Sequence, residues 1–109
     1  YETVGLLLFL IPLKEPPHIN GSEEHEEISV IVNNPLELTC IASGIPAPKM
    51  TWMKDGHPLI KAKGVEILDE GHILQLKNIH VSDTGRYVCV AVNVSGVHSH
   101  LSVICLIVG

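Results

Sequence analysis

The stretch Asp83-Thr-Gly-Arg-Tyr-Val-Cys89 decides the fold of this chain of 109 residues. Tyr87 stands two positions before Cys89, and buried-type side chains alternate with others through the run, which is the period of a strand. Cys40 lies in the middle of an earlier alternating run, and Trp52 lies in the run that follows it. Because side chains on a strand alternate between its faces, all four of these residues are expected to point into one core.

The rest of the chain has the rhythm of an all-β domain. From Glu15 onward, short alternating runs are separated by turn residues at spacings of about 8–12, which favours a sandwich or a barrel. The predicted strands cover residues 28–32, 36–42, 49–54, 65–68, 72–77, 86–92 and 97–104, the last two joined by a turn at 93–96. We predict one domain over residues 16–106. Residues 1–15 are interpreted as an apolar tail or leader remnant, and residues 107–109 as a tail.

The order cysteine, tryptophan, Tyr-x-Cys resembles the framework of an immunoglobulin-type two-sheet Greek-key sandwich. Over residues 17–103, the chain resembles the intermediate set (I-set) of the immunoglobulin family. The resemblance implies a disulfide between Cys40 and Cys89 that joins the sheets and stabilises by about 4 kcal/mol, because it closes a long loop. Trp52 is expected to pack on this disulfide, and the Tyr87 hydroxyl to cap the corner before its strand. The family's core signature falls on Trp52, Leu76, Asp83, Gly85 and Tyr87.

Two stretches, residues 16–21 and 34–48, further resemble the repeats of a very long extracellular-matrix protein made largely of such domains. The resemblance implies a secreted module for cell adhesion or matrix assembly, or a cell-surface ectodomain. Its partners would be other immunoglobulin-like domains, tandem or homophilic, or extracellular proteins. A passive spacer and an intracellular muscle-type domain with reduced cysteines remain alternatives. The apolar runs 4–13 and 103–108 are each too short to span a membrane, so membrane attachment is expected only through parts outside this chain.

Composition argues against nucleic-acid binding, and the motifs argue against catalysis. Twelve acidic and seven dispersed basic side chains give a net charge of −5, and one Trp, two Tyr and one Phe offer no stacking platform. No motif brings a nucleophile to an oriented base, so we expect no enzyme activity, no cofactor and no small-molecule substrate. His98 and His100 share a face of a strand, but the ligand spacings of zinc modules are absent, so no metal site is predicted. Residues 23–27 are interpreted as a charged loop.

Strand parity predicts an apolar outer face on one sheet. If Cys89 and Trp52 point inward, their neighbours along each strand point outward. Leu101 and Val103 are predicted inward on the last strand, which also turns Cys105 inward as a buried free thiol. The candidate contact face is then Thr51, Met53, Val88, Val90, Val92, His98 and His100. Valine also suits strands whatever it faces, so strand propensity alone remains an alternative to contact. Histidines buried in a contact would weaken it near about pH 6.

Two sequons predict glycosylation. Asn20-Gly-Ser22 lies in the leading segment, where it should be accessible. Asn93-Val-Ser95 lies at the last turn, where an asparagine is also expected because it tolerates a left-handed backbone. A glycan at Asn93 would restrict docking at that end of the domain.

Overall fold

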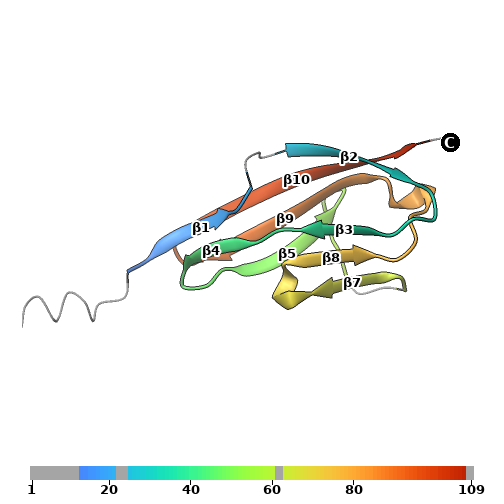
Figure 1. The fold of residues 1–109 in the computed structure, drawn as a ribbon. Helices are drawn as coiled ribbons and strands as arrows, with labels where there is room; N and C mark the ends of the chain where they lie inside the picture. Colours follow the sequence, from blue (N-terminus) through green and yellow to red (C-terminus); the bar gives the residue numbers. More distant parts are fainter. Residues whose placement is uncertain (1–12, 22–24, 61–62, 108–109) are drawn as a thin grey trace, which may run out of the picture.

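The computed structural model describes residues 13–21, 25–60 and 63–107, which form two packed layers of strands (Figure 1). The larger layer is a five-stranded sheet in the order β2-β10-β9-β5-β6. Neighbouring strands in it run antiparallel, except that β2 lies parallel to β10 at the edge. Its strands are β2 (His25–Ile31), β5 (Lys49–Lys54), β6 (His57–Pro58), β9 (Gly85–Asn93) and β10 (Gly96–Ile107).

The smaller layer consists of a three-stranded sheet, in the order β3-β8-β7, and a two-stranded sheet of β1 and β4. The predicted strand 36–42 is interrupted at Cys40 and Ile41, between β3 and β4. The backbone there bonds outside the ladders, because Cys40 N–H donates to His72 O (2.7 Å) and Ile41 O accepts from Asn20 N–H (2.7 Å). The elements are β1 (Glu15–Ile19), β3 (Leu36–Thr39), β4 (Ala42–Ile45), β7 (Val65–Leu68), β8 (Ile73–Leu76) and the 3₁₀ turns η1 (Asp69–Gly71) and η2 (Val81–Asp83).

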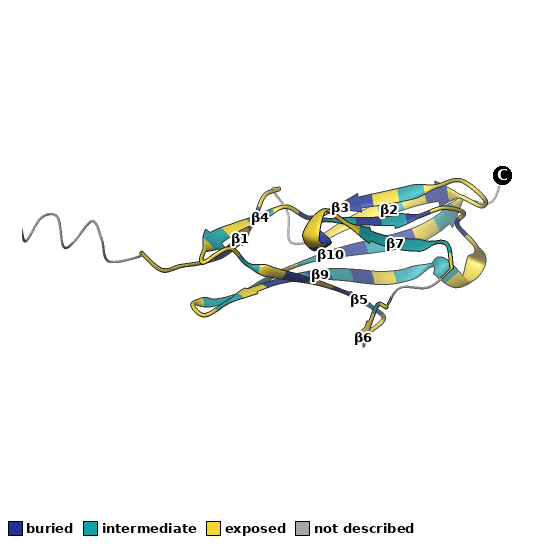
Figure 2. Cartoon of the chain, turned by 90° about the horizontal axis from the view of Figure 1, so that it is seen from below, coloured by how far each residue is buried: buried dark blue, intermediate teal, exposed yellow. Residues whose placement is uncertain are grey.

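The core lies between the two layers, where the inward faces of both meet (Figure 2). It is built from every second residue of the central strands, as the alternation of side chains requires. The layers and their Greek-key connections are those of an immunoglobulin-like sandwich, which confirms the predicted fold class. The buried apolar residues are Ile19, Val30, Leu38, Cys40, Met50, Trp52, Leu74, Leu76, Ile79, Tyr87, Cys89, Ala91 and Ile104.

The leading and closing strands are longer than predicted. Residues 25–27 were expected in a charged loop, but they form the start of β2 at the sheet edge, where charged side chains are common. β10 continues to Ile107, three residues past its predicted end. The strands thus run from Glu15 to Ile107, one residue beyond the predicted domain limits at each end. The interpretations given for residues 1–12, 23–24 and 108–109 lie outside the described residues.

Candidate interaction surface

The disulfide expected between Cys40 and Cys89 is present and joins the two layers, with 6.5 Å between the Cα atoms. Trp52 lies opposite Cys89 in the β5–β9 ladder and is buried beside the bridge. Its indole Nε1–H donates to Gly71 O at 2.7 Å, so its one polar atom is satisfied inside the core. The implied disulfide is therefore confirmed, and Trp52 is buried in the core.

The corner before β9 is held by Tyr87. Its hydroxyl donates to Asp83 O at 2.6 Å, which confirms the expected corner bond. Burial raises the pKa of Tyr87, and the carboxylates of Asp83 and Asp55 add to the rise. Gly85 has a φ of 146°, and a Cβ placed on it would come within 2.7 Å of both Asp55 carboxylate oxygens. Asp55 Oδ1 accepts from Arg86 N–H at 3.0 Å, so this glycine gives the carboxylate access to the backbone.

The outer face of the five-stranded sheet carries an apolar block. Thr51, Met53, Val88, Val90 and Val92 alternate with inward-pointing residues and lie on this outer face, as predicted. At the centre of the block, one row of cross-strand neighbours runs Leu101, Val88, Met53, from β10 across β9 to β5. The smaller layer is more mixed, because its outward positions include Glu37, Thr39, Gln75 and Lys77 beside the apolar Ile41, Leu68 and Ile73.

The predicted parity of β10 is wrong. His100 is the cross-strand partner of Cys89, and His98 is the partner of Ala91, so both histidines point inward with their partners. Leu101 and Val103 take the outward positions instead. The contact face therefore loses the two histidines and gains two apolar side chains. The expected weakening of a contact near pH 6 loses its basis, because the histidines do not lie on that face.

Cys105 shares the outward parity of Leu101 and Val103. The structure places its thiol at the surface, where the sequence predicted a buried one. It neighbours Ser29 of the edge strand β2 in the parallel ladder. The thiol thus lies on the outer face of the sheet, toward the end where β10 finishes.

The two inward histidines contact the first two strands, His98 contacting β1 and His100 contacting β2. His98 Nδ1 accepts from Ile19 N–H at 2.8 Å, which requires an unprotonated Nδ1. The His98 ring also stacks on His18, with 5.6 Å between centroids and 16° between planes. In this way β1 is held to the larger layer by a side chain, although its ladder lies in the smaller layer.

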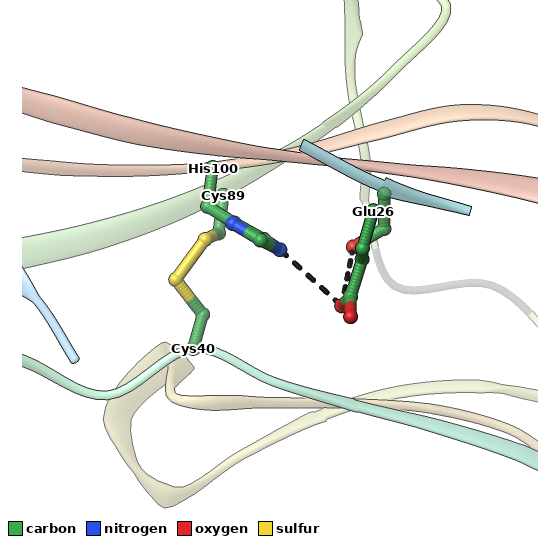
Figure 3. Close-up of polar contacts among 5 residues, drawn as sticks. Glu26, Cys40, Cys89 and His100 are labelled. Carbon is green, nitrogen blue, oxygen red and sulfur yellow. Dashed lines mark hydrogen bonds and ion pairs between the residues drawn. A yellow bond between two sulfur atoms is a disulfide. The ribbon is translucent and has the colours of Figure 1, made fainter. Parts of the chain in front are cut away.

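His100 contacts β2, which already pairs with β10 in the larger sheet. Its Nε2 lies 3.3 Å from Glu26 Oε1, and the Ser102 hydroxyl donates to the same oxygen at 3.3 Å. Figure 3 shows the His100 ring beside the disulfide, on the inward side of the sheet and directed at Glu26. Histidines at these positions therefore have a structural role that parity counted from apolar residues did not reveal.

The sequons differ in their surroundings. Asn20 is exposed, although Ser22 of its sequon lies outside the described residues. The Asn93 side chain is occupied, because Nδ2 donates to Glu15 O (2.7 Å) and Pro46 O (3.0 Å) while Oδ1 accepts from Ser95 N–H (2.8 Å). Asn93 is not among the residues with positive φ, so the left-handed backbone offered as its structural reason is wrong.

Neither a metal centre nor a catalytic constellation emerges from the described part of the chain. It contains no group of three or more His, Cys, Asp or Glu side chains placed to hold a metal. A cleft of about 500 Å³ has Val65 and Leu76 in its lining, with Lys63, Lys77, His80 and Asp83. Two of its charged side chains are already engaged, because Lys77 Nζ lies 3.6 Å from Glu66 Oε1 and the Asp83 carboxylate accepts from His80 N–H at 2.7 Å. None of the helical turns described is long and apolar enough to cross a membrane.

Comparisons with known proteins show what this chain is similar to. A family model described as "Immunoglobulin domain" matches residues 16–93. Human hemicentin-1 is 66% identical over 88 residues, which make up 81% of this chain and 2% of that protein. Muscle M-line assembly protein unc-89 of Caenorhabditis elegans is 39% identical over 67% of this chain and 1% of that protein. The chain therefore spans only a small fraction of the length of these relatives.

A solved structure gives the same picture of the fold. A structure of Sidekick-1 immunoglobulin domains 1-5 superposes with a TM-score of 0.78 at 26% identity. The match covers 86% of this chain and 20% of that one.

Proposed function

Since the chain belongs to the immunoglobulin-domain family, we propose that it is a non-catalytic extracellular module, one of a tandem array, that serves cell adhesion or matrix assembly through protein contacts. Likeness to repeats of human hemicentin-1 supports this placement. The disulfide supports it too, because such bonds persist in oxidising compartments outside the cytosol. The likeness to unc-89 favours an intracellular muscle-type domain as the second candidate, in which the same cysteines would stay reduced.

The observation that carries the contact function is the outer face of the five-stranded sheet. We define the contact face as Thr51, Met53, Val88, Val90, Val92, Leu101 and Val103. Contiguous apolar surface of this kind marks interaction sites more often than scattered apolar residues do. The partner we propose for it is another immunoglobulin-like domain or a second copy of this chain. Each valine that becomes fully covered contributes about 1.5 kcal/mol, and about 1.4 kcal/mol is tenfold in affinity.

The test replaces Val90 with glutamate, because Val90 lies in the middle of β9 between Ser99 and Thr51. A matched control is Ile41→Glu, which places the same charge on an exposed apolar position of the opposite layer. Association is measured by sedimentation and by aggregation of beads coated with the protein, whose many copies amplify a weak contact. We expect Val90→Glu to weaken association about tenfold, and Ile41→Glu to leave it unchanged.

Melting temperature is measured on both variants so that loss of contact is separated from loss of fold. If the wild-type chain and Val90→Glu associate equally while both remain folded, the contact face is not used. The passive spacer is then the better description of the domain.

A further inference from the structure

Exposed apolar side chains gather at the two ends of the domain. Of twelve large apolar residues exposed in the described ranges, only Ile41, Ile60 and Leu68 lie between the ends. Five form what we call the amino-pole cap, at the end where β1 begins: Leu13, Ile45, Val92, Val94 and Val97. Four form the carboxyl-pole cap, at the end where β10 finishes: Ile31, Val32, Val81 and Ile107. Single exposed apolar residues need no explanation, but grouping at both poles does.

The amino-pole cap stands on three segments that Asn93 ties together. Its side-chain amide donates to Glu15 O at the start of β1 and to Pro46 O in the loop after β4. Its oxygen accepts from Ser95 N–H and so fixes the turn between β9 and β10. These three segments carry Leu13, Ile45 and Val94, whose exposed fractions are 71%, 41% and 75%. The surface is therefore preformed, and less entropy is lost when a partner covers it.

The carboxyl-pole cap is assembled in a similar way. Ile31 and Ile107 are neighbours at the ends of β2 and β10 in the parallel ladder. The turn that carries Val32 is joined to Ile79 by two backbone bonds, from Asn33 N–H to Ile79 O (2.8 Å) and from Ile79 N–H to Asn34 O (3.0 Å). Val81 follows two residues later and is 70% exposed.

We propose that the amino-pole cap is the docking surface for the carboxyl-pole cap of the preceding immunoglobulin-like domain in the same chain. The strands begin at one end of the sandwich and finish at the other, so a tandem array brings the carboxyl pole of one domain to the amino pole of the next (Figure 1). Tandem domains move relative to each other unless their interface is sufficiently large and apolar, and the two caps supply apolar surface on both sides. The contact is head-to-tail and repeats along an array without closing.

This inference rests on the tandem arrangement in the proposed function, and its test uses one polypeptide with two full copies of the chain in series. The connecting residues hold the poles at a high effective concentration, so even a weak contact is measurable. Val94→Asp is placed in the second copy only. The control is Ile60→Asp in the same copy, because Ile60 is as exposed as Val94, 76% against 75%, and lies between the poles, next to Leu59, whose N–H donates to Trp52 O inside β5. ¹⁵N relaxation then reports whether the two domains tumble together.

In the unsubstituted tandem and in the Ile60→Asp control, we expect both domains to share one slow correlation time. In Val94→Asp, each domain should tumble nearly as fast as the isolated chain. Equal melting temperatures of the single-domain variants exclude unfolding, and Val94→Ser gives a milder second variant. Independent tumbling in the unsubstituted tandem, or joint tumbling that survives both Val94 substitutions, overturns the proposal. Either result leaves the contact face untouched, because that face is tested on the single chain through Val90.

Discussion

At the scale of single residues, the Tyr87 hydroxyl is held by one hydrogen bond at the corner before β9. It is buried against the core and donates to Asp83 O. In Tyr87→Phe this carbonyl loses its partner, and we expect the free energy of unfolding to fall by about 1 kcal/mol at neutral pH. Urea unfolding of the variant beside the wild type measures the loss. An unchanged midpoint and slope would mean that the corner bond contributes nothing to stability.

The raised pKa of Tyr87 adds a pH dependence whose sign is fixed. Its unfolded form titrates near the ordinary value of about 10, and its folded form above that. The stabilisation is therefore complete below about pH 10 and is lost as pH rises toward the folded value, because the unfolded state releases the proton first. Tyr87→Phe should lack this alkaline loss. The measurement is made with Cys105 alkylated, so that its thiolate cannot attack the disulfide.

At the scale of elements, β10 shows where sequence reasoning failed and which signal was overlooked. Its residues 103 to 107 are apolar on both parities, so hydrophobicity does not choose a face. The turn between β9 and β10 decides which face each residue of β10 takes, because it pairs Asn93 with Gly96. Counting along both strands from this pair places Cys89 opposite His100. The same reasoning succeeded for β5 and β9, where a tryptophan and two framework residues mark the inward face.

Polar partners explain why histidine and serine occupy inward positions of β10. The chain passes from the smaller layer to the larger one between β1 and β2. At this crossing, the Ile19 N–H of β1 bonds to His98, and the Glu26 carboxylate of β2 accepts from Ser102. No local pattern in the sequence shows these contacts, because the contacting residues lie 74 to 79 positions apart. Position-specific chemistry of this kind therefore becomes visible only once the strands have been placed.

A pair of substitutions tests the role of His98 in holding β1. His98→Phe keeps the ring stacked on His18 but removes the acceptor of Ile19 N–H. We expect it to cost about 1 kcal/mol and to speed hydrogen exchange at the Ile19 amide. His18→Phe is the control, because it changes the other ring of the stack and leaves the acceptor in place. Equal exchange at Ile19 in the two variants would contradict this role of His98.

At the scale of the whole molecule, the two layers need little explanation beyond the framework residues. One disulfide, one tryptophan and one tyrosine corner give the sandwich, and they were visible in the sequence because their order along the chain is typical of the immunoglobulin framework. The grouping of apolar residues at the poles was not visible. It arises from loops and strand ends that are distant in the chain and meet only in the folded domain.

The covalent state of the protein after passage through a secretory host tests whether it is suited to an extracellular compartment. A secreted, extracellular protein should arrive with Cys40 and Cys89 bonded and with one titratable thiol, at Cys105, in denaturant. Because Asn20 is exposed while both bonds of the Asn93 amide nitrogen are used inside the fold, we expect a glycan on Asn20 and an unmodified Asn93.

Mass spectrometry before and after glycosidase, combined with thiol titration, reads all of these states in one sample. Asn20→Gln is the control variant, and it should remove the entire mass loss on glycosidase treatment. A residual loss in that variant would place sugar on Asn93, which requires the three segments at the amino pole to be open when the chain is modified. Three free thiols in the secreted protein would favour the muscle-type domain, since the fold would then persist without its bridge.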